Sequence, residues 1–163
     1  MTVEDQTYNK AITELNLGNY KKALILFDQV LAKSPRDVNA LLKKGNILGK
    51  FGKFTEAIKE YDSVLKIDPR NILALINKGL AMHYLEDYES ALSCYAEVLK
   101  LKPNSAIALY NKASTLVKTG KVEEGLGTLQ EAIKIDFSYK YKARLDIDFE
   151  HIYKNNSFKR IVL

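Results

Sequence analysis

The sequence contains little cysteine and histidine, which build disulfide bonds and take part in many metal sites and catalytic centres. Among its 163 residues there is one cysteine, Cys94, with two histidines and no tryptophan. A single cysteine excludes an internal disulfide bond and fits a reducing compartment. Neither His83 nor His151 has a cysteine or a paired carboxylate at ligand spacing, and the metalloprotease, Cys-x-x-Cys and P-loop motifs are absent. We therefore expect no metal, no other cofactor and no enzymatic activity, with Cys94 in a packing role.

Long hydrophobic runs are absent as well. No apolar stretch approaches the roughly 20 residues that span a bilayer. The first residues, MTVEDQTYN, lack the basic start and apolar run of a secretory signal. Hydrophobic residues make up 47% of the chain, which is ordinary for a globular protein and argues against disorder. We expect a soluble, cytoplasmic protein with no membrane partner.

The net charge of +5 is modest and unevenly distributed. Most of the positive excess lies in residues 38–71 and 140–163. A mild basic excess can steer an acidic partner toward the protein, but it is a weak indication of nucleic-acid binding. We therefore rank nucleic acid last among the partners that the sequence allows.

Proline is scarce, and its spacing is regular. All three prolines, Pro35, Pro69 and Pro103, are 34 residues apart. Internal repeats of this length are sought first because they decide the whole fold. The period divides most of the chain into four blocks without insertions, which are residues 4–37, 38–71, 72–105 and 106–139.

The apolar spacing within each block predicts two helices joined by a turn. A glycine that permits a positive φ angle ends the first helix of three blocks, whereas the third block has Glu86 there. These turn glycines are Gly18, Gly52 and Gly120. Proline ends the second helix, and a polar residue two positions later is a good N-cap for the next one. The predicted caps are Asp37, Asn71 and Ser105.

Small residues recur where the two helices of a block should cross, as with Gly45 and Ala57. The second helix repeats an aromatic-x-x-Ala-Leu/Ile-x-x-aromatic pattern, which in the third block runs from Tyr88 to Tyr95. One hairpin cannot bury both of its faces, so neighbouring blocks must stack into a solenoid with a continuous core.

This pattern of a small residue, a turn glycine, an aromatic-framed alanine and a closing proline resembles the tetratricopeptide repeat (TPR) over residues 4–139. The resemblance implies an all-α fold, a right-handed TPR solenoid of four helix-turn-helix repeats followed by C-terminal capping helices. The fourth block departs from the pattern, with Gly125 in place of alanine and Phe137 in place of proline. Because glycine inside a helix costs about 1 kcal/mol relative to alanine, we expect this hairpin to be the softest.

Residues 140–163 follow the last repeat and predict a C-terminal capping segment of short helices. Asp148 and Ser157 are the expected caps of two of them. The Asp-x-Asp-Phe and Ser-Phe-Lys patterns are similar to tails that follow the last repeat of many prokaryotic TPR proteins. An alternative is that a tail helix lies in the groove of its own chain or of a neighbour, giving autoinhibition or dimerisation.

In TPR proteins the first helix of each hairpin lines a concave groove, so the resemblance implies a partner-binding surface there. Asparagine can donate to and accept from a peptide backbone whatever the side chains of the ligand, with apolar contacts between the asparagines. The alternative is that these asparagines bond only to neighbouring helices or water. The implied groove residues are Asn9, Leu42, Lys43, Asn46, Lys50, Ile76, Asn77, Leu80, His83, Tyr84, Tyr110, Asn111, Ser114 and Lys118.

A lysine recurs at one position of every repeat, where the family usually has leucine. We predict that its aliphatic stem covers apolar surface while the ammonium group reaches water. The four lysines are Lys10, Lys44, Lys78 and Lys112.

The resemblance implies a non-enzymatic scaffold that binds another protein through an extended peptide or a helix. Only Asn46 and Asn77 match the two-lysine, two-asparagine and arginine clamp of TPR proteins that bind acidic chaperone tails. That clamp is therefore not predicted, although an acidic segment remains a candidate partner near Lys43 and Lys50. Self-assembly into a homo-oligomer such as a dimer is the alternative function, and nucleic-acid binding ranks third.

Overall fold

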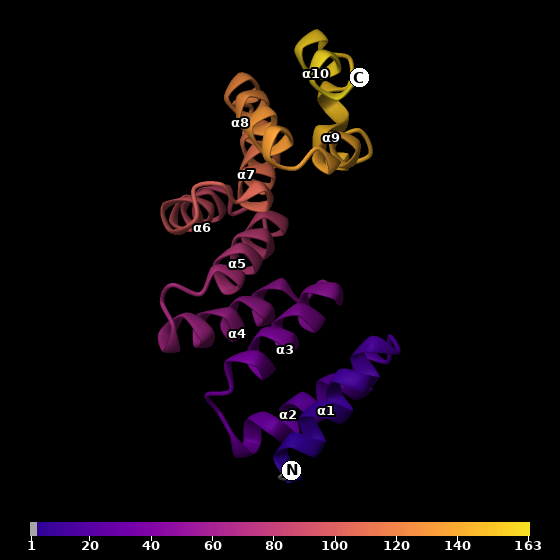
Figure 1. The fold of residues 1–163 in the computed structure, drawn as a ribbon, viewed down its shortest axis with the longest axis vertical. Coiled ribbons are helices and arrows are strands. Elements are labelled where there is room, and N and C mark those ends of the chain that lie inside the picture. The colour runs from indigo at the N-terminus through magenta and orange to yellow at the C-terminus, as the bar shows by residue number, and fades with distance from the viewer. Residues whose placement is uncertain (1–2) are drawn as a thin grey trace. The chain divides into compact units, whose positions relative to one another are not determined.

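The computed structural model describes residues 3–163, with side chains from Gln6 onward. Every regular element in this range is a helix (Figure 1), which confirms the all-α prediction. In chain order the elements are α1 (Val3–Asn16), α2 (Tyr20–Lys33), α3 (Val38–Lys50), α4 (Phe54–Ile67), α5 (Ile72–Tyr84), α6 (Tyr88–Leu101), α7 (Ala106–Lys118), α8 (Val122–Ile135), α9 (Ser138–Ala143), the 3₁₀ helix η1 (Ile147–Ile152) and α10 (Asn156–Val162).

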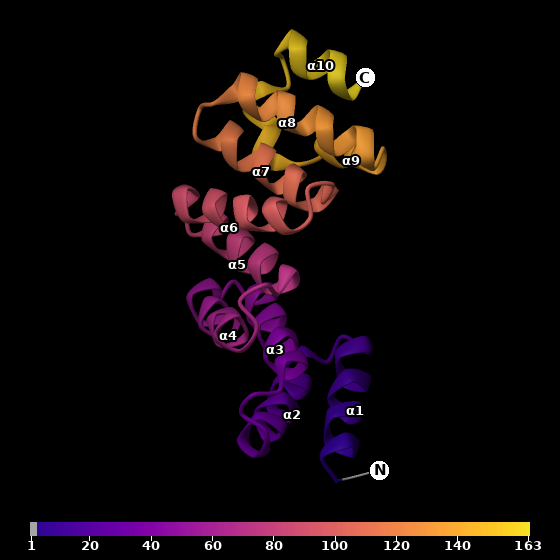
Figure 2. The same cartoon turned by 60° about the vertical axis from the view of Figure 1, so that its left-hand side comes forward.

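The chain forms two compact units, whose boundary lies within α5. Unit 1 is Met1–Ala81 and unit 2 is Met82–Leu163. In unit 1, α1 packs with α2 and α3 packs with α4 as the predicted hairpins, and Figures 1 and 2 show the members of each pair side by side. Phe27 and Tyr61 are the large buried aromatic side chains of this unit.

The turns between the two helices of each hairpin follow the glycine prediction. Gly18, Gly52 and Gly120 have φ angles of 77°, 72° and 82°. The third hairpin makes the same turn with Glu86, at a φ of 61°. Left-handed backbone is unfavourable for a residue with a Cβ atom, so the repeat geometry imposes this conformation without glycine.

Two of the three predicted repeat caps are confirmed. The Asp37 and Asn71 side chains accept hydrogen bonds from the backbone N–H groups of Ala40 and Ala74, each at 3.0 Å. Ser105 occupies the N-cap position of α7, but its side chain makes no capping hydrogen bond. The prediction that the Ser105 side chain caps α7 is therefore wrong, although the residue lies at the expected position.

The predicted close approach of paired helices is confirmed at two glycines. A Cβ atom on Gly45 would lie 2.6 Å from Cε1 of Tyr61. A Cβ atom on Gly125 would lie 2.6 Å from Cγ2 of Val117 and 3.0 Å from the backbone oxygen of Ala113. Gly125 is therefore a packing requirement of the α7–α8 crossing. The softness of this hairpin stays a prediction, based on helix propensity alone.

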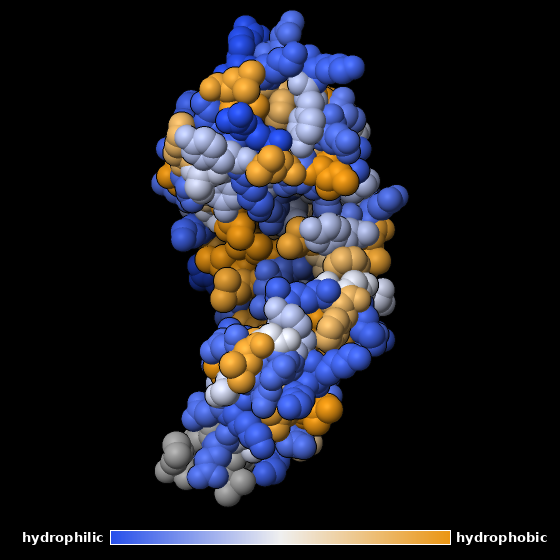
Figure 3. All heavy atoms as spheres, turned by 90° about the vertical axis from the view of Figure 1, so that its right-hand side faces the viewer, coloured by the Kyte–Doolittle hydropathy of each residue, from blue (hydrophilic) through white to orange (hydrophobic). Residues whose placement is uncertain are grey.

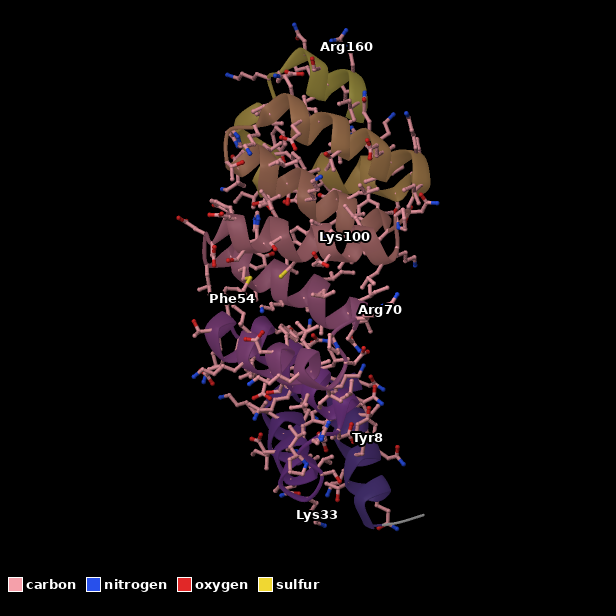
Figure 4. The ribbon with its side chains drawn as sticks, turned by 90° about the vertical axis from the view of Figure 1, so that its left-hand side faces the viewer. Tyr8, Lys33, Phe54, Arg70, Lys100 and Arg160 are labelled. Carbon is pink, nitrogen blue, oxygen red and sulfur yellow. The ribbon has the colours of Figure 1, made fainter. Side chains whose placement is uncertain are left out.

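In unit 2 the tail adds α9, η1 and α10 to the last hairpin, which confirms the predicted capping helices (Figure 2). Phe149 stacks on Phe158, with ring centroids 5.6 Å apart, and both side chains belong to the core that contains Tyr110. Figure 4 shows Arg160 on α10 with its side chain directed away from the helices.

The caps of the tail helices differ from those expected. Asp146, and not Asp148, caps η1 by accepting a hydrogen bond from the Asp148 backbone N–H at 3.1 Å. Asn155, and not Ser157, caps α10 by accepting from the N–H groups of Ser157 and Phe158 at 2.7 and 3.1 Å. In both cases the cap lies two residues before the predicted one, which leaves the Asp148 carboxylate available for another contact.

Candidate functional site

The predicted groove residues of unit 1 lie on α1, α3 and α5, and we call them the unit-1 wall. Leu42 and Ile76 are buried and form its apolar base. Asn46 and Lys50 are exposed above that base. The wall therefore combines covered hydrophobic residues with polar groups that reach solvent. Its members are Asn9, Leu42, Lys43, Asn46, Lys50, Ile76, Asn77 and Leu80.

Two asparagines of the unit-1 wall are joined to each other. Nδ2 of Asn77 donates to Oδ1 of Asn46 at 2.8 Å, and the Tyr61 hydroxyl donates to the same oxygen at 2.9 Å. These two donors match the two lone pairs of an amide oxygen. Burial raises the pKa of Tyr61 to about 12, so its hydroxyl stays protonated as a donor. The Asn46 amide nitrogen and the Asn77 oxygen are the atoms that these bonds leave for a partner.

The recurring lysines make ion pairs between helices. Nζ of Lys44, on α3, lies 2.9 Å from Asp28 Oδ1 on α2 and 3.0 Å from Glu60 Oε1 on α4. Nζ of Lys78 lies 2.6 Å from Asp62 Oδ1, which repeats the first pair one period later. Burial opposes the charge of Lys44, but its two carboxylate partners outweigh burial and raise its pKa. These two lysines lie at helix interfaces, as predicted, but their ammonium groups pair with carboxylates, where the prediction was contact with water.

The predicted groove residues of unit 2 lie on α5 and α7, and we call them the unit-2 wall. Four of them, His83, Tyr110, Asn111 and Ser114, are buried, whereas Tyr84 and Lys118 are exposed. The cover comes from the chain itself, because η1 packs on α7. The tail therefore caps the last hairpin and also occupies the unit-2 wall of its own chain.

His83 connects three elements of unit 2. Its Nδ1 atom lies 2.8 Å from Oγ1 of Thr115, whose hydroxyl donates to the Asn111 backbone oxygen. Its Nε2 atom lies 3.1 Å from Oδ2 of Asp148 on η1. The imidazole of α5 therefore bridges the Thr115 hydroxyl on α7 and the carboxylate of η1.

The environment of Asp148 favours its ionised form. Burial alone would raise the pKa of this carboxyl group. The hydrogen bond and charge of His83, with smaller contributions from Lys118 and Ser114, outweigh burial and lower the Asp148 pKa below its usual value. The carboxylate of η1 and the imidazole of α5 are therefore electrostatically matched.

Tyr110 makes the second polar contact with the tail. Its hydroxyl donates to Oδ2 of Asp146 at 2.5 Å. Its ring stacks on Tyr139 at 4.7 Å between centroids and meets the edge of Phe149 at 5.9 Å. Nζ of Lys142 lies 4.3 Å from the centre of the same ring. Burial, followed by the Asp146 hydrogen bond and charge, raises the pKa of Tyr110, so the hydroxyl remains a donor.

Sequence reasoning placed His83, Tyr110 and Ser114 on one wall and offered a tail helix in the groove only as an alternative, without naming the tail residues that contact them. The carboxylates of Asp146 and Asp148 lie in the tail, outside the repeat, where the period gives no register. A usable signal was the Asp-x-Asp-Phe pattern itself, since two acids beside an aromatic residue match a wall of donors and rings. Tyr61 is a buried core residue, and its hydroxyl also positions Asn46.

The described surface has further hollows but no metal-binding cluster. A hollow of about 410 Å³ lies beside α8 and α10, lined by residues that include Glu123, Gln130 and Arg160. On the face shown in Figure 3, hydrophobic side chains reach the surface in several groups among hydrophilic ones. Among the side chains from Gln6 to Leu163, no group of three or more histidine, cysteine, aspartate or glutamate residues could hold a metal ion. Over the same range, no helix has the length and hydrophobicity to cross a membrane.

The sequence profile of the tetratricopeptide repeat matches residues 8–72 and 77–138. The chain belongs to the tetratricopeptide repeat family. This TPR assignment confirms the resemblance drawn from the spacing of prolines and glycines. A comparison with curated proteins finds no match.

Solved TPR structures share the fold of this chain. MamA from Desulfovibrio magneticus RS-1 aligns with a TM-score of 0.80 and 22% identity, over 99% of this chain and 94% of that one. TTC0263, a TPR protein of Thermus thermophilus, aligns at 0.79 and 17%, over 98% and 88%. YrrB, described as a TPR protein with an unusual peptide-binding site, aligns at 0.71 and 18%, over 95% and 80%.

Proposed function

We propose that this TPR protein is a non-enzymatic scaffold that binds a peptide segment or helix of a partner protein through the unit-1 wall. The observation that carries the proposal is the Asn46–Asn77 pair, which the Tyr61 hydroxyl holds in place. Pre-positioned amides lose little side-chain freedom when a ligand binds, and this favours affinity. The pair offers one donor group and one acceptor, which is what one peptide unit needs.

The charges beside this pair favour an acidic partner segment. Lys50 is exposed, with Nζ 5.3 Å from the centre of the Tyr20 ring, and Lys43 is half-buried on the same wall. Most of the positive excess of the repeats lies in residues 38–71, which include both lysines. Such charges raise association rates with an acidic segment and make them sensitive to salt.

Membership of the TPR family supports an interaction role, and YrrB, by its description, has a peptide-binding site. Self-assembly is the alternative function. Molar mass measured by light scattering over a concentration series distinguishes the two, because a hetero-binding scaffold stays monomeric at all concentrations.

The test is photo-crosslinking in lysate with benzoylphenylalanine in place of Lys50, or of Lys59 on α4 as an exposed control. We expect a specific adduct from the Lys50 position that is lost when Asn46→Ala/Asn77→Ala is added. The matched control is Gln29→Ala, which removes an exposed amide from α2 and should leave the adduct unchanged. An adduct that survives the double substitution, or that forms equally from Lys59, would contradict binding at the unit-1 wall.

A further inference from the structure

Residues 146–149 lie on the unit-2 wall in the manner of a bound ligand. Their two carboxylates each meet a side-chain donor of a repeat helix: Asp146 meets the Tyr110 hydroxyl at 2.5 Å, and Asp148 meets Nε2 of His83 at 3.1 Å. Phe149 has no exposed surface and packs against Tyr110. Charge-assisted hydrogen bonds of this kind are roughly twice as strong as neutral ones.

The remaining position of this segment is not recognised. Ile147 lies between the two aspartates and is 75% exposed, and the preceding Leu145 is also exposed. The unit-2 wall therefore contacts Asp146, Asp148 and Phe149 of this segment, whereas the side chain of Ile147 points to solvent. Recognition of alternate side chains with an aromatic anchor is how a short peptide gains specificity on a rigid surface.

The polar groups of the unit-2 wall are not required by the repeat. One period upstream, the positions of Tyr110, Ser114 and Thr115 hold three apolar residues. These are Ile76, Leu80 and Ala81. His83 corresponds in the same way to Gly49. Since helix packing at the equivalent positions of the preceding repeats is satisfied by apolar residues or glycine, the Tyr110 hydroxyl and the His83 imidazole are available to contact the acidic segment.

We propose that the unit-2 wall is a binding site for acidic–aromatic protein segments of the Asp-x-Asp-Phe type, and that residues 146–149 are the chain's own competing occupant. A partner protein that carries such a segment displaces η1 and takes its contacts with His83 and Tyr110. The donors belong to α5 and α7, which are repeat helices, and α10 also packs on α8 and α9. The internal occupant lowers the apparent affinity by the fraction of time that the wall is open.

This site is separate from the unit-1 wall, so the inference does not depend on the proposed function. Its probe is a fluorescent peptide with the sequence of Leu145–Tyr153, and its readout is fluorescence anisotropy with the full-length chain. The variant is Asp146→Asn/Asp148→Asn, which weakens the internal occupant and keeps a side chain able to cap η1. We expect the peptide to bind this variant at least tenfold more tightly than it binds the wild type.

Two controls identify the contacts. The same peptide with both aspartates changed to asparagine should not bind the double variant. Adding His83→Leu/Tyr110→Phe to the double variant should remove binding of the acidic peptide, because neither replacement side chain can donate a hydrogen bond. Circular dichroism establishes that each variant is folded. Equal affinity of the acidic and neutral peptides would overturn the proposal.

Hydrogen exchange in the wild type makes the test independent of the variants. Saturating peptide should raise the exchange rates of the Phe149 and Ile152 amides, because the displaced η1 loses its protection. The proposal is wrong if these rates do not change, or if the double variant exposes η1 and still does not bind the peptide. Concentration-dependent dimerisation without peptide binding would assign the wall to the tail of a second copy and would also overturn it.

Discussion

The two walls are built from the same positions of one repeat, yet one presents polar atoms to solvent and the other is covered. In unit 1 the asparagine pair and Lys50 lie at the surface, above Leu42 and Ile76. In unit 2 the corresponding surface is occupied by η1. Repeat position decides where a side chain points, whereas the identity of the side chain decides what it can bind. A wall with His83 and Tyr110 attracts carboxylates, and the tail supplies two of them.

The largest expected effect comes from Phe149→Ala, which should disrupt unit 2 alone. The side chain is fully buried between Tyr110 and Phe158, and truncation of such a phenylalanine costs about 3–5 kcal/mol of unfolding free energy. Hydrogen exchange should report the loss in η1, α7 and α10, with α1 to α3 unchanged. Leu73→Ala is the control, because its exposed side chain should contribute less than about 0.5 kcal/mol. Equal loss of protection in α1 to α3 would contradict the assignment to unit 2.

Gly125→Ala should destabilise the hairpin of α7 and α8, although alanine is the better helix former. The new methyl group would collide with Val117 and with the Ala113 carbonyl, and overpacking of this kind costs about 1–3 kcal/mol. Gly127→Ala is the matched control on the same helix, because nothing lies within 4 Å of its added Cβ atom. That control should gain up to about 1 kcal/mol. Chemical denaturation compares the two, and a stabilised Gly125→Ala would show that α8 shifts freely.

Acidification should release η1 from the unit-2 wall. The pKa of Asp148 is lowered in the docked state because His83, Lys118 and Ser114 outweigh the effect of burial. A depressed pKa means that the contact is fully formed above the ordinary value of 3.8 and is lost as the pH falls through the lower, docked value. Exchange of the Phe149 amide, corrected for its intrinsic pH dependence, measures this release. In the Asp148→Asn variant, which leaves Asp146 and Lys118 unchanged, the pH-dependent rise in exchange that comes from protonation of Asp148 should disappear.

The smallest effect is expected from the ion pairs of unit 1. Lys78→Met removes the pair with Asp62 while retaining most of the aliphatic stem. Because both side chains are partly exposed, the loss should be below about 1 kcal/mol and should shrink in high salt. Thermal unfolding at low and high salt measures it. Lys112→Met is the control without an equivalent acid, since Ala96 stands one period after Asp62. Equal losses of stability in Lys78→Met and Lys112→Met would show that the effect does not come from the ion pair with Asp62.

The helices and turns of the repeats followed from the sequence because a period of 34 applies the same constraints several times. Gly18, Gly52 and Gly120 each reach the φ angle that the turn requires, and even Glu86 conforms. The tail has no such register, so its caps were displaced by two residues. Asp148 was expected to cap a helix, but it meets His83, a residue 65 positions earlier in the chain. Contacts between the tail and a repeat helix depend on tertiary packing that local spacing does not encode.

The lysine pairs show both what sequence reasoning found and what it missed. The interface position of Lys44 and Lys78 was predicted, but their acids were not. The signal was present, because Asp28 precedes Lys44 by the same interval at which Asp62 precedes Lys78.

The prediction of the unit-2 wall was incomplete for a different reason. Its residues were inferred one repeat at a time, and nothing in a single repeat indicates that a later segment covers it.

The Lys–Asp pairs of unit 1 form the same connection between consecutive repeats. Each pair joins the first helix of one repeat to the second helix of the repeat before it. Residues 38–71 contain both kinds of partner: Lys44 pairs with Asp28 of the preceding repeat, and Asp62 pairs with Lys78 of the following one. A duplicated copy of this segment, inserted after Asn71, would therefore find a matching charge on both sides. The array could be lengthened there by whole modules, one period at a time, without leaving a carboxylate unpaired.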